Sequence, residues 1–160
     1  MFAVQLAKHF GAHVTGVCST ANVELVASLG ADRVIDYSKE DFTDGGHRYD
    51  AILDTVGGSS FSRSKRVLAP YGRHVFVVQT LTQLLQSLWT SLRPGKRVIV
   101  AFSSGDSKDD LLFIKRLIDA GVIRPMIDRT FSLQNIVDAH RYVDTGRKRG
   151  GVVVSISGSA

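Results

Sequence analysis

A strand, a helix and a second strand follow one another within a single stretch of this chain, residues 11–38. β-Branched residues predict strands at 13–18 and 32–37, and apolar residues at helical spacing predict a helix at 20–30 between them. Two adjacent strands joined through a helix run parallel, because the helix returns the chain to the edge where the first strand began. This unit therefore restricts the chain to α/β folds with a parallel sheet.

The same alternation continues along most of the 160 residues. Further strands are predicted at 51–54, 73–78, 96–102, 126–131 and 152–156. Further helices are predicted at 2–10, within 59–72 where Pro70 and Gly72 stop the helix, and at 81–92, 107–121 and 133–146. Because no repeat, low-complexity stretch or linker interrupts this order, we expect one domain over 1–160, with 145–160 as a C-terminal tail strand.

Composition excludes several classes of protein. Hydrophobic residues make up 44% and charged residues 22%, yet no apolar run approaches the ~18 residues that cross a bilayer, so no membrane partner is expected. The single cysteine, Cys18, excludes an internal disulfide and a cysteine-rich zinc cluster, and together with the absence of a signal-peptide pattern it favours a cytoplasmic location. The net charge of +5 is scattered and not interleaved with aromatic residues, so no nucleic-acid partner is predicted.

Hydroxyl groups and glycines dominate the carboxyl ends of the predicted strands. These ends are 18–20, 36–38, 54–58, 77–79 and 102–105. Ligands of open α/β sheets bind beyond such ends, and hydroxyls with backbone N–H groups suit the sugar and phosphate oxygens of a nucleotide. Serine, threonine and glycine are also ordinary loop residues, but their recurrence at five ends favours a nucleotide site.

Ser19 and Thr20 occupy the position where NAD-selective sheets carry an acid. A carboxylate there would repel a 2′-phosphate, so the sequence favours NADP(H). Tyr37 is either a contact on the adenine side or a half-buried strand-edge residue. Asp36 and Asp54 are expected to cap loops rather than to act as an acid–base pair. The five histidines have no metal-like spacing and are expected on surfaces or helix faces; they are His9, His13, His47, His74 and His140.

Three blocks resemble the medium-chain dehydrogenase/reductase superfamily, in particular its zinc-independent, quinone-oxidoreductase-like branch. They are "FAVQLAKHFGAHVTGVCSTANVELVASLGADRVIDYSKEDFT", "YDAILDTVGG" and "DAHRYVDTGRKRGGVVVSI". The resemblance implies a Rossmann-like, doubly wound, mostly parallel sheet that binds NADPH and transfers hydride to a quinone, enone or other carbonyl compound. It implies Ser19, Thr20 and Tyr37 near the 2′-phosphate and Gly57 along the cofactor cleft. It further implies that Val77, Val78 and Phe102 lie near the nicotinamide end.

The chain departs from that family in three places. The glycine-rich turn, the strand before it and the catalytic half have no counterpart before Met1, so we expect a truncated cofactor domain with no assigned catalytic residue and no metal. Ala21 stands where many relatives carry arginine, and Gly151 where relatives often carry lysine or asparagine. Without the central strand, the strands at 13–18 and 51–54 could pair directly, the run at 152–156 could move inward, or another chain could donate a strand.

Three functional hypotheses remain open at this level. The first is the NADP(H)-binding portion of a zinc-independent oxidoreductase whose partner is a small-molecule quinone or carbonyl compound. The alternative is a non-catalytic nucleotide-binding or interaction remnant of such an enzyme, and the third is an unstable fragment of a longer gene. A homodimer, or docking to another chain through unpaired strands, is compatible with the first two.

Overall fold

The structure, a computed structural model, describes residues 1–78, 80–101 and 107–156 and divides into two compact units. The first unit comprises Met1–Lys39 and Lys108–Ala160, and the second comprises Glu40–Ser107. Every strand pairing among the described residues is parallel, which confirms the α/β class with parallel sheets. The expectation of a single domain over 1–160 stays a prediction.

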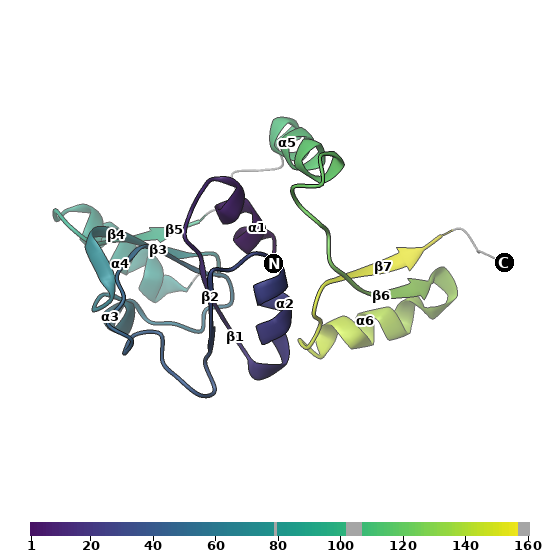
Figure 1. The fold of residues 1–160 in the computed structure, drawn as a ribbon, viewed down its shortest axis with the longest axis horizontal. Helices are drawn as coiled ribbons and strands as arrows, with labels where there is room; N and C mark the ends of the chain where they lie inside the picture. The colour runs from purple at the N-terminus through teal and green to yellow at the C-terminus, as the bar shows by residue number, and fades with distance from the viewer. Residues whose placement is uncertain (79, 102–106, 157–160) are drawn as a thin grey trace. The chain divides into compact units, whose positions relative to one another are not determined.

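In the first unit, β1 (Thr15–Cys18) and β2 (Arg33–Asp36) form a two-stranded parallel sheet with Thr15 opposite Arg33. The short 3₁₀ helix η1 (Thr20–Asn22) and helix α2 (Val23–Ser28) connect the two strands. Figure 1 shows α2 beside β1 and β2. Gly16 of β1 is buried so close to α2 that a Cβ atom there would collide with the Val26 side chain. The strand–helix–strand unit predicted at 11–38 is thus confirmed.

Helix α1 (Phe2–His9) is fixed within the first unit by two polar contacts. Lys8 Nζ donates to both carboxylate oxygens of Asp32, at 2.8 and 2.9 Å, and Val14 N donates to Asp32 Oδ2 at 2.7 Å. These bonds lower the pKa of Asp32 to about 2. The buried Gln5 side chain donates to Arg124 O at 3.2 Å and accepts from Arg124 N at 2.8 Å, so residues 119 positions apart lie together.

The later part of the first unit contains a second parallel sheet. Its elements are α5 (Lys108–Asp119), β6 (Ile127–Ser132), η2 (Leu133–Asn135), α6 (Ile136–Asp144) and β7 (Gly151–Ser155). Strands β6 and β7 pair in parallel, and α6 lies along them (Figure 1). Because β7 pairs with β6, the alternative in which 152–156 moves inward is wrong.

The second unit is a three-stranded parallel sheet in the order β3–β4–β5. Its elements are β3 (Tyr49–Asp54), α3 (Phe61–Ser64), β4 (Leu68–Phe76), α4 (Leu81–Ser91) and β5 (Arg97–Val100). Its buried apolar core includes Val67, Leu68, Phe76, Val98 and Val100. This core places the carboxyl ends of β3 and β4 side by side, because Asp54 is paired with Phe76.

One predicted helix is wrong in extent. The helix expected within 59–72 spans only Phe61–Ser64, and β4 begins at Leu68 and continues through Pro70 and Gly72. The register between β3 and β4 shifts here, since Tyr49 pairs with Leu68 while Ala51 pairs with Arg73. Proline lacks the N–H that a strand ladder needs and is tolerated at such an irregularity. Pro70, which was expected to stop a helix, therefore lies at an irregularity of strand β4.

Candidate functional site

The residues predicted at the ends of β1 and β2 lie together around Asp36. Thr20 Oγ1 donates to Asp36 Oδ2 at 2.6 Å, and Ser38 donates to Asp36 Oδ1 from Oγ at 2.6 Å and from its backbone N at 3.0 Å. Lys39 Nζ lies 3.5 Å from Asp36 Oδ2. The Ser38 and Thr20 hydroxyls, with Lys39, lower the pKa of Asp36 to about 2. We call Ser19, Thr20, Asp36, Tyr37, Ser38 and Lys39 the Asp36 cluster.

Ser19 and Tyr37 complete this cluster. Ser19 Oγ accepts from Asn22 Nδ2 at 3.2 Å, which leaves the Ser19 hydroxyl hydrogen as a donor toward a ligand as far as the described residues show. Tyr37 N donates to Cys18 O at 3.0 Å, so Tyr37 lies beside the end of β1 with its side chain 64% exposed. The structure thus brings Ser19, Thr20 and Tyr37 together at one edge of one sheet.

Two features of the Asp36 cluster differ from what the sequence suggested. The hydroxyl hydrogen of Thr20 is directed to Asp36, so Thr20 offers a ligand lone pairs rather than a donor. Lys39, whose side chain is 70% exposed, adds a positive charge to the cluster, and sequence reasoning did not single it out. The signal was its position three residues after the strand-end Asp36. The expectation that Asp36 caps a loop is confirmed.

In the second unit, Asp54 organises the loop that follows β3. Its Oδ1 accepts from Val56 N at 3.0 Å and Gly57 N at 2.7 Å, and its Oδ2 accepts from Ser59 N at 2.8 Å and Ser59 Oγ at 2.6 Å. Gly57 has a φ of +75°, a conformation that favours glycine. Burial alone would raise the pKa of Asp54, but the bonds from Ser59, Val56 and Gly57 prevail and lower it. Asp54 is therefore a loop cap, as predicted.

His74 of β4 extends this network into the core. Its Nε2 lies 3.1 Å from Ser59 Oγ, and since that hydroxyl donates to Asp54, Nε2 acts as the donor. The His74 side chain is fully buried, and its ring centroid lies 4.0 Å from that of Phe76. Burial lowers the pKa of His74, although the nearby Asp54 charge opposes this.

The expectation of a surface or helix-face histidine is wrong for His74. The signal that could have identified it is the two-residue period of a half-buried strand, because Gly72, His74 and Phe76 are all buried. A Ser59–Asp54–His74 arrangement does not match a nucleophilic triad, since the serine hydrogen is donated to the carboxylate and not to the imidazole.

Gly57, Val77 and Val78 lie at the same edge of the second unit. Val77 N donates to Asp54 O at 2.9 Å, and a Cβ atom on Gly57 would lie 3.8 Å from Val78. Val77 and Val78 are 45% and 48% exposed, so they form an apolar surface next to the polar loop. Phe102 lies outside the described residues. The structure therefore brings Gly57, Val77 and Val78 together within the second unit. Ser19, Thr20 and Tyr37 lie together within the first unit.

The described residues contain neither a metal-ligand group nor a membrane-spanning helix. Among the described residues no three His, Cys, Asp or Glu side chains group as metal ligands would, and the pKa of the Cys18 thiol is raised by burial and by Asp36. These residues do not fit a zinc ion. Within the same described ranges, no helix combines the length and apolar character required to cross a bilayer.

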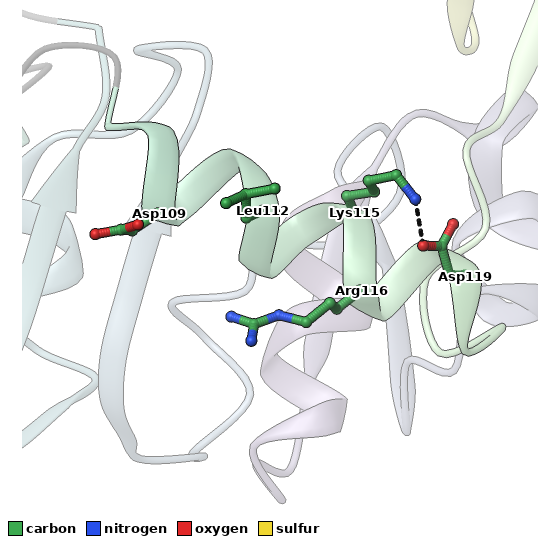
Figure 2. A pocket seen from close by; sticks show the side chains of 5 residues that line it. All are labelled: Asp109, Leu112, Lys115, Arg116 and Asp119. Carbon is green, nitrogen blue, oxygen red and sulfur yellow. Dashed lines mark hydrogen bonds and ion pairs between the residues drawn. The ribbon is translucent and has the colours of Figure 1, made fainter.

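A hollow on the surface of α5 lies apart in sequence from every predicted site residue (Figure 2). Five side chains of this one helix line it, and Lys115 Nζ forms an ion pair with Asp119 Oδ2 at 2.5 Å; the five are Asp109, Leu112, Lys115, Arg116 and Asp119. A single helix face cannot surround a ligand, so the candidate site remains the ends of the parallel strands.

The sequence comparisons with known proteins agree on one family. A family described as zinc-binding dehydrogenase matches residues 29–154. The chain is 35% identical to the mitochondrial NAD(P)H oxidoreductase RTN4IP1 of Mus musculus, over 97% of this chain and 44% of that protein. It is 36% identical to the 2-methylene-furan-3-one reductase of Solanum lycopersicum, over 94% of this chain and 36% of that protein.

The fold agrees with these sequence matches. The solved quinone oxidoreductase from Coxiella burnetii superimposes with a TM-score of 0.82 and 28% identity, over 97% of this chain and 48% of that one. The chain thus spans less than half the length of the proteins compared here. The α/β architecture with parallel sheets matches a Rossmann-like cofactor domain, as expected from the sequence. The chain belongs to the zinc-binding dehydrogenase family of the medium-chain dehydrogenase/reductase superfamily.

Proposed function

We propose that this chain is the NADP(H)-binding portion of an oxidoreductase that acts on a quinone, an enone or another carbonyl compound without zinc. The observation that carries the choice of NADP(H) is the Asp36 cluster. The negative charge of Asp36 is compensated there by hydrogen bonds from Thr20 and Ser38 and by Lys39. These bonds and the Lys39 ammonium group would offset the repulsion between Asp36 and a 2′-phosphate.

Three donors of the Asp36 cluster suit a phosphate monoester. They are Lys39 Nζ, the Ser19 hydroxyl and the hydroxyl of the exposed Tyr37. Charge-assisted hydrogen bonds of this kind are stronger than neutral ones, so Lys39 contributes most to discrimination between NADPH and NADH.

Taken by itself, the second unit offers a surface that suits the nicotinamide end of the cofactor. Asp54 holds the loop around Gly57 in one conformation, and Val77 and Val78 offer an apolar surface that suits the flat nicotinamide ring. When bound, the nicotinamide cofactor supplies the hydride. The residues described here bind and orient it, and none is assigned a proton-transfer role.

The names of similar proteins support a small-molecule quinone or carbonyl substrate, since they include a quinone oxidoreductase and a furanone reductase. The zinc-independent reaction stays a prediction from the resemblance. The cytoplasmic location expected from the sequence stays a prediction, because the mouse relative is named mitochondrial. The absence of a nucleic-acid partner and the strand-mediated dimer also stay predictions.

Titration of NADPH and NADH against the chain and the variant Lys39→Gln tests the cofactor proposal. We expect Lys39→Gln to weaken NADPH binding about tenfold or more while NADH binding is unchanged, because only NADPH carries the 2′-phosphate. Lys115→Gln, at an exposed lysine of α5, is the matched control and should change neither. Equal weakening of both nucleotides by Lys39→Gln, or no binding of either, would contradict the proposal.

Catalysis is tested separately from binding. NADPH absorbance is followed after addition of phenanthrenequinone to the chain. Oxidation of NADPH supports a catalytic role for the chain itself, whereas tight NADPH binding without oxidation supports the alternative of a non-catalytic nucleotide-binding remnant.

A further inference from the structure

His74 is a fully buried ionisable side chain to which the proposed function assigns no role. It lies on β4, the central strand of the second unit, where Ile52 of β3 and Val98 of β5 flank it in the strand register. Its ring centroid lies 4.0 Å from that of Phe76 and 6.3 Å from that of Phe61 of α3. The residues that flank the ring from both neighbouring strands and from α3 are therefore apolar.

The two ring nitrogens of His74 have different surroundings. Nε2 donates to Ser59 Oγ at 3.1 Å, because that hydroxyl gives its own hydrogen to Asp54. Nδ1 is then the nitrogen that carries the lone pair, and it is buried with no hydrogen-bond partner among the described residues. A further proton can therefore add only at Nδ1.

The charged groups around His74 do not compensate a proton at Nδ1. Asp54 acts on the ring, but it reaches the Nε2 side through Ser59. The other charged residues of β3, β4, β5 and α3 are not buried: Asp50, Arg63, Arg73 and Arg97. Helix α4, which binds β5 through Ser87, carries no charged residue from Leu81 to Ser91. Among these residues, none offers Nδ1 a negative charge.

The loop at 55–59 closes the Nε2 side of the His74 ring. Asp54 accepts hydrogen bonds from the backbone N atoms of Val56 and Gly57. It also accepts from Ser59, whose hydroxyl joins the loop to the ring. The strand pairing that flanks the ring through β3 and β5 does not include this loop. Opening of the loop is therefore the smallest movement that admits water to the ring.

A proton on Nδ1 gives the ring a charge and a buried N–H that no acceptor faces. An unpaired buried charge costs more free energy than the few hydrogen bonds of a largely exposed loop contribute, so the loop opens and water reaches the ring. We propose that His74 is a positioning residue for the 55–59 loop: the neutral ring holds the loop in place through Ser59, and a proton on Nδ1 releases it.

The direction of the pH dependence follows from burial. Burial lowers the pKa of His74 from 6.5, although the Asp54 charge opposes this. The ring is therefore neutral at pH 7, and the loop is released only as pH falls below 6.5. Gly57 of this loop lies beside Val78, since a Cβ atom on the glycine would be 3.8 Å from it. The consequence for the cofactor rests on the proposed function: the nicotinamide end binds less tightly when the loop is released.

Backbone dynamics of the chain without nucleotide test the loop directly. The {¹H}–¹⁵N NOE of the loop amides and the ring signal of His74 are measured by NMR from about pH 7.5 to about pH 5. We expect the NOE at Val56, Gly57 and Ser59 to fall by about a third or more, because a released loop moves on the ps–ns timescale. The midpoint of this fall should coincide with the titration of the His74 ring.

Three variants isolate the contribution of His74, with circular dichroism checking that the helix content is unchanged. His74→Gln keeps an N–H toward Ser59 but does not titrate, so its loop NOE should not depend on pH. His47→Gln, at an exposed histidine of the same unit, is the matched control and should respond as the native chain does. Ser59→Ala removes the hydroxyl between ring and loop, so Val56 and Gly57 should no longer follow His74; it tests the same link if His74→Gln does not fold.

Two ligands test the consequence for the cofactor. NADP⁺ carries the nicotinamide, whereas adenosine 2′,5′-bisphosphate carries the 2′-phosphate without it. Because a phosphate monoester itself titrates at about pH 6, each affinity is compared between the native chain and His74→Gln. Between about pH 7.5 and about pH 5, we expect the native chain to lose about fivefold more affinity for NADP⁺ than His74→Gln loses. Both should lose the same affinity for the bisphosphate.

Failure of this proposal differs from failure of the proposed function. A loop whose NOE stays constant while His74 titrates, a loop that responds equally in His74→Gln, or a ring that stays neutral at about pH 5 would overturn the proposal. So would a loss of NADP⁺ affinity that is equal in the native chain and His74→Gln. A loop that follows His74 in a chain that binds neither ligand would contradict the proposed function alone.

Discussion

At the scale of single residues, Gly16 determines how closely α2 approaches β1. A Cβ atom at this position would collide with Val26 Cγ1, so helix or strand would have to move. We expect Gly16→Ala to lower the free energy of unfolding by about 1–3 kcal/mol, the usual cost of an overpacked core. Urea unfolding followed by circular dichroism measures this cost.

A double-mutant cycle provides the control for Gly16. In a background with Val26→Ala the colliding methyl group is absent, so Gly16→Ala should cost clearly less there than in the native chain. An equal cost in both backgrounds would show that the backbone of Gly16, and not its contact with α2, sets the preference for glycine.

The residues of the candidate site could be predicted from the sequence where they follow the carboxyl end of a predicted strand. Ser19, Thr20 and Tyr37 follow strongly β-branched runs, and parallel strands place their carboxyl ends at one edge. Lys39 and His74 were not predicted as site residues, because the role of each depends on the side chain that it contacts in the folded chain. Lys39 lies against Asp36, and His74 binds a serine 15 positions earlier in the chain. Residue types and periodicity indicate where these two residues stand in the sequence, but not which partner each one binds.

At the scale of elements, the hydrogen bond between α6 and β6 should stabilise the C-terminal sheet. Tyr142 Oη donates to Asp128 Oδ2 at 2.6 Å, and Arg149 N donates to the same oxygen at 2.7 Å. We expect Tyr142→Phe to lower the melting temperature by about 2–4 °C. The variant removes the hydrogen bond from Tyr142 to Asp128 and leaves the bond from Arg149 N. Thermal unfolding followed by circular dichroism measures this shift.

Tyr71→Phe is the matched control for this element, because Tyr71 is 74% exposed and the same hydroxyl is removed. It should leave the melting temperature unchanged. If both variants lower it equally, the contribution of the Asp128 bond is refuted.

Element type was predicted well where periodicity ran long and poorly where it was short. Helix α5 was expected at 107–121 and spans Lys108–Asp119, since its apolar residues recur over three turns. The segment 59–72 was assigned to a helix from serine caps and a proline stop. Its strand character depends on pairing with β3, a tertiary contact that local propensity does not contain.

At the scale of the whole chain, the sequence shows no boundary, yet the structure divides into two units. The first unit is discontinuous, since it joins Met1–Lys39 to the segment that begins at Lys108. Gln5 contributes to this joining through its two bonds with Arg124. Neither composition nor local sequence pattern indicates a contact between residues 119 positions apart, so this contact is seen only in the folded structure.

The dependence of stability on pH follows from the groups whose pKa values change on folding. The pKa of His74 is lowered from 6.5 by burial, so near pH 6 the unfolded chain binds a proton that the folded chain does not. Stability is therefore full above pH 6.5 and falls as pH drops below it. Asp32 and Asp36, lowered from 3.8 to about 2, add a second loss as pH falls from about 4 to 2.

Urea unfolding between pH 8 and pH 3 should resolve the two losses of stability. His74→Gln should remove only the loss that begins below pH 6.5. Glutamine keeps an N–H that can donate to Ser59 but does not titrate, so its stability should be nearly flat from pH 7 to pH 5. The loss below pH 4 should persist in this variant, because Asp32 and Asp36 still carry their partners. If the native chain and His74→Gln lose stability equally between pH 7 and pH 5, His74 is not the group that titrates on unfolding, and the buried bond to Ser59 has no part in the pH response.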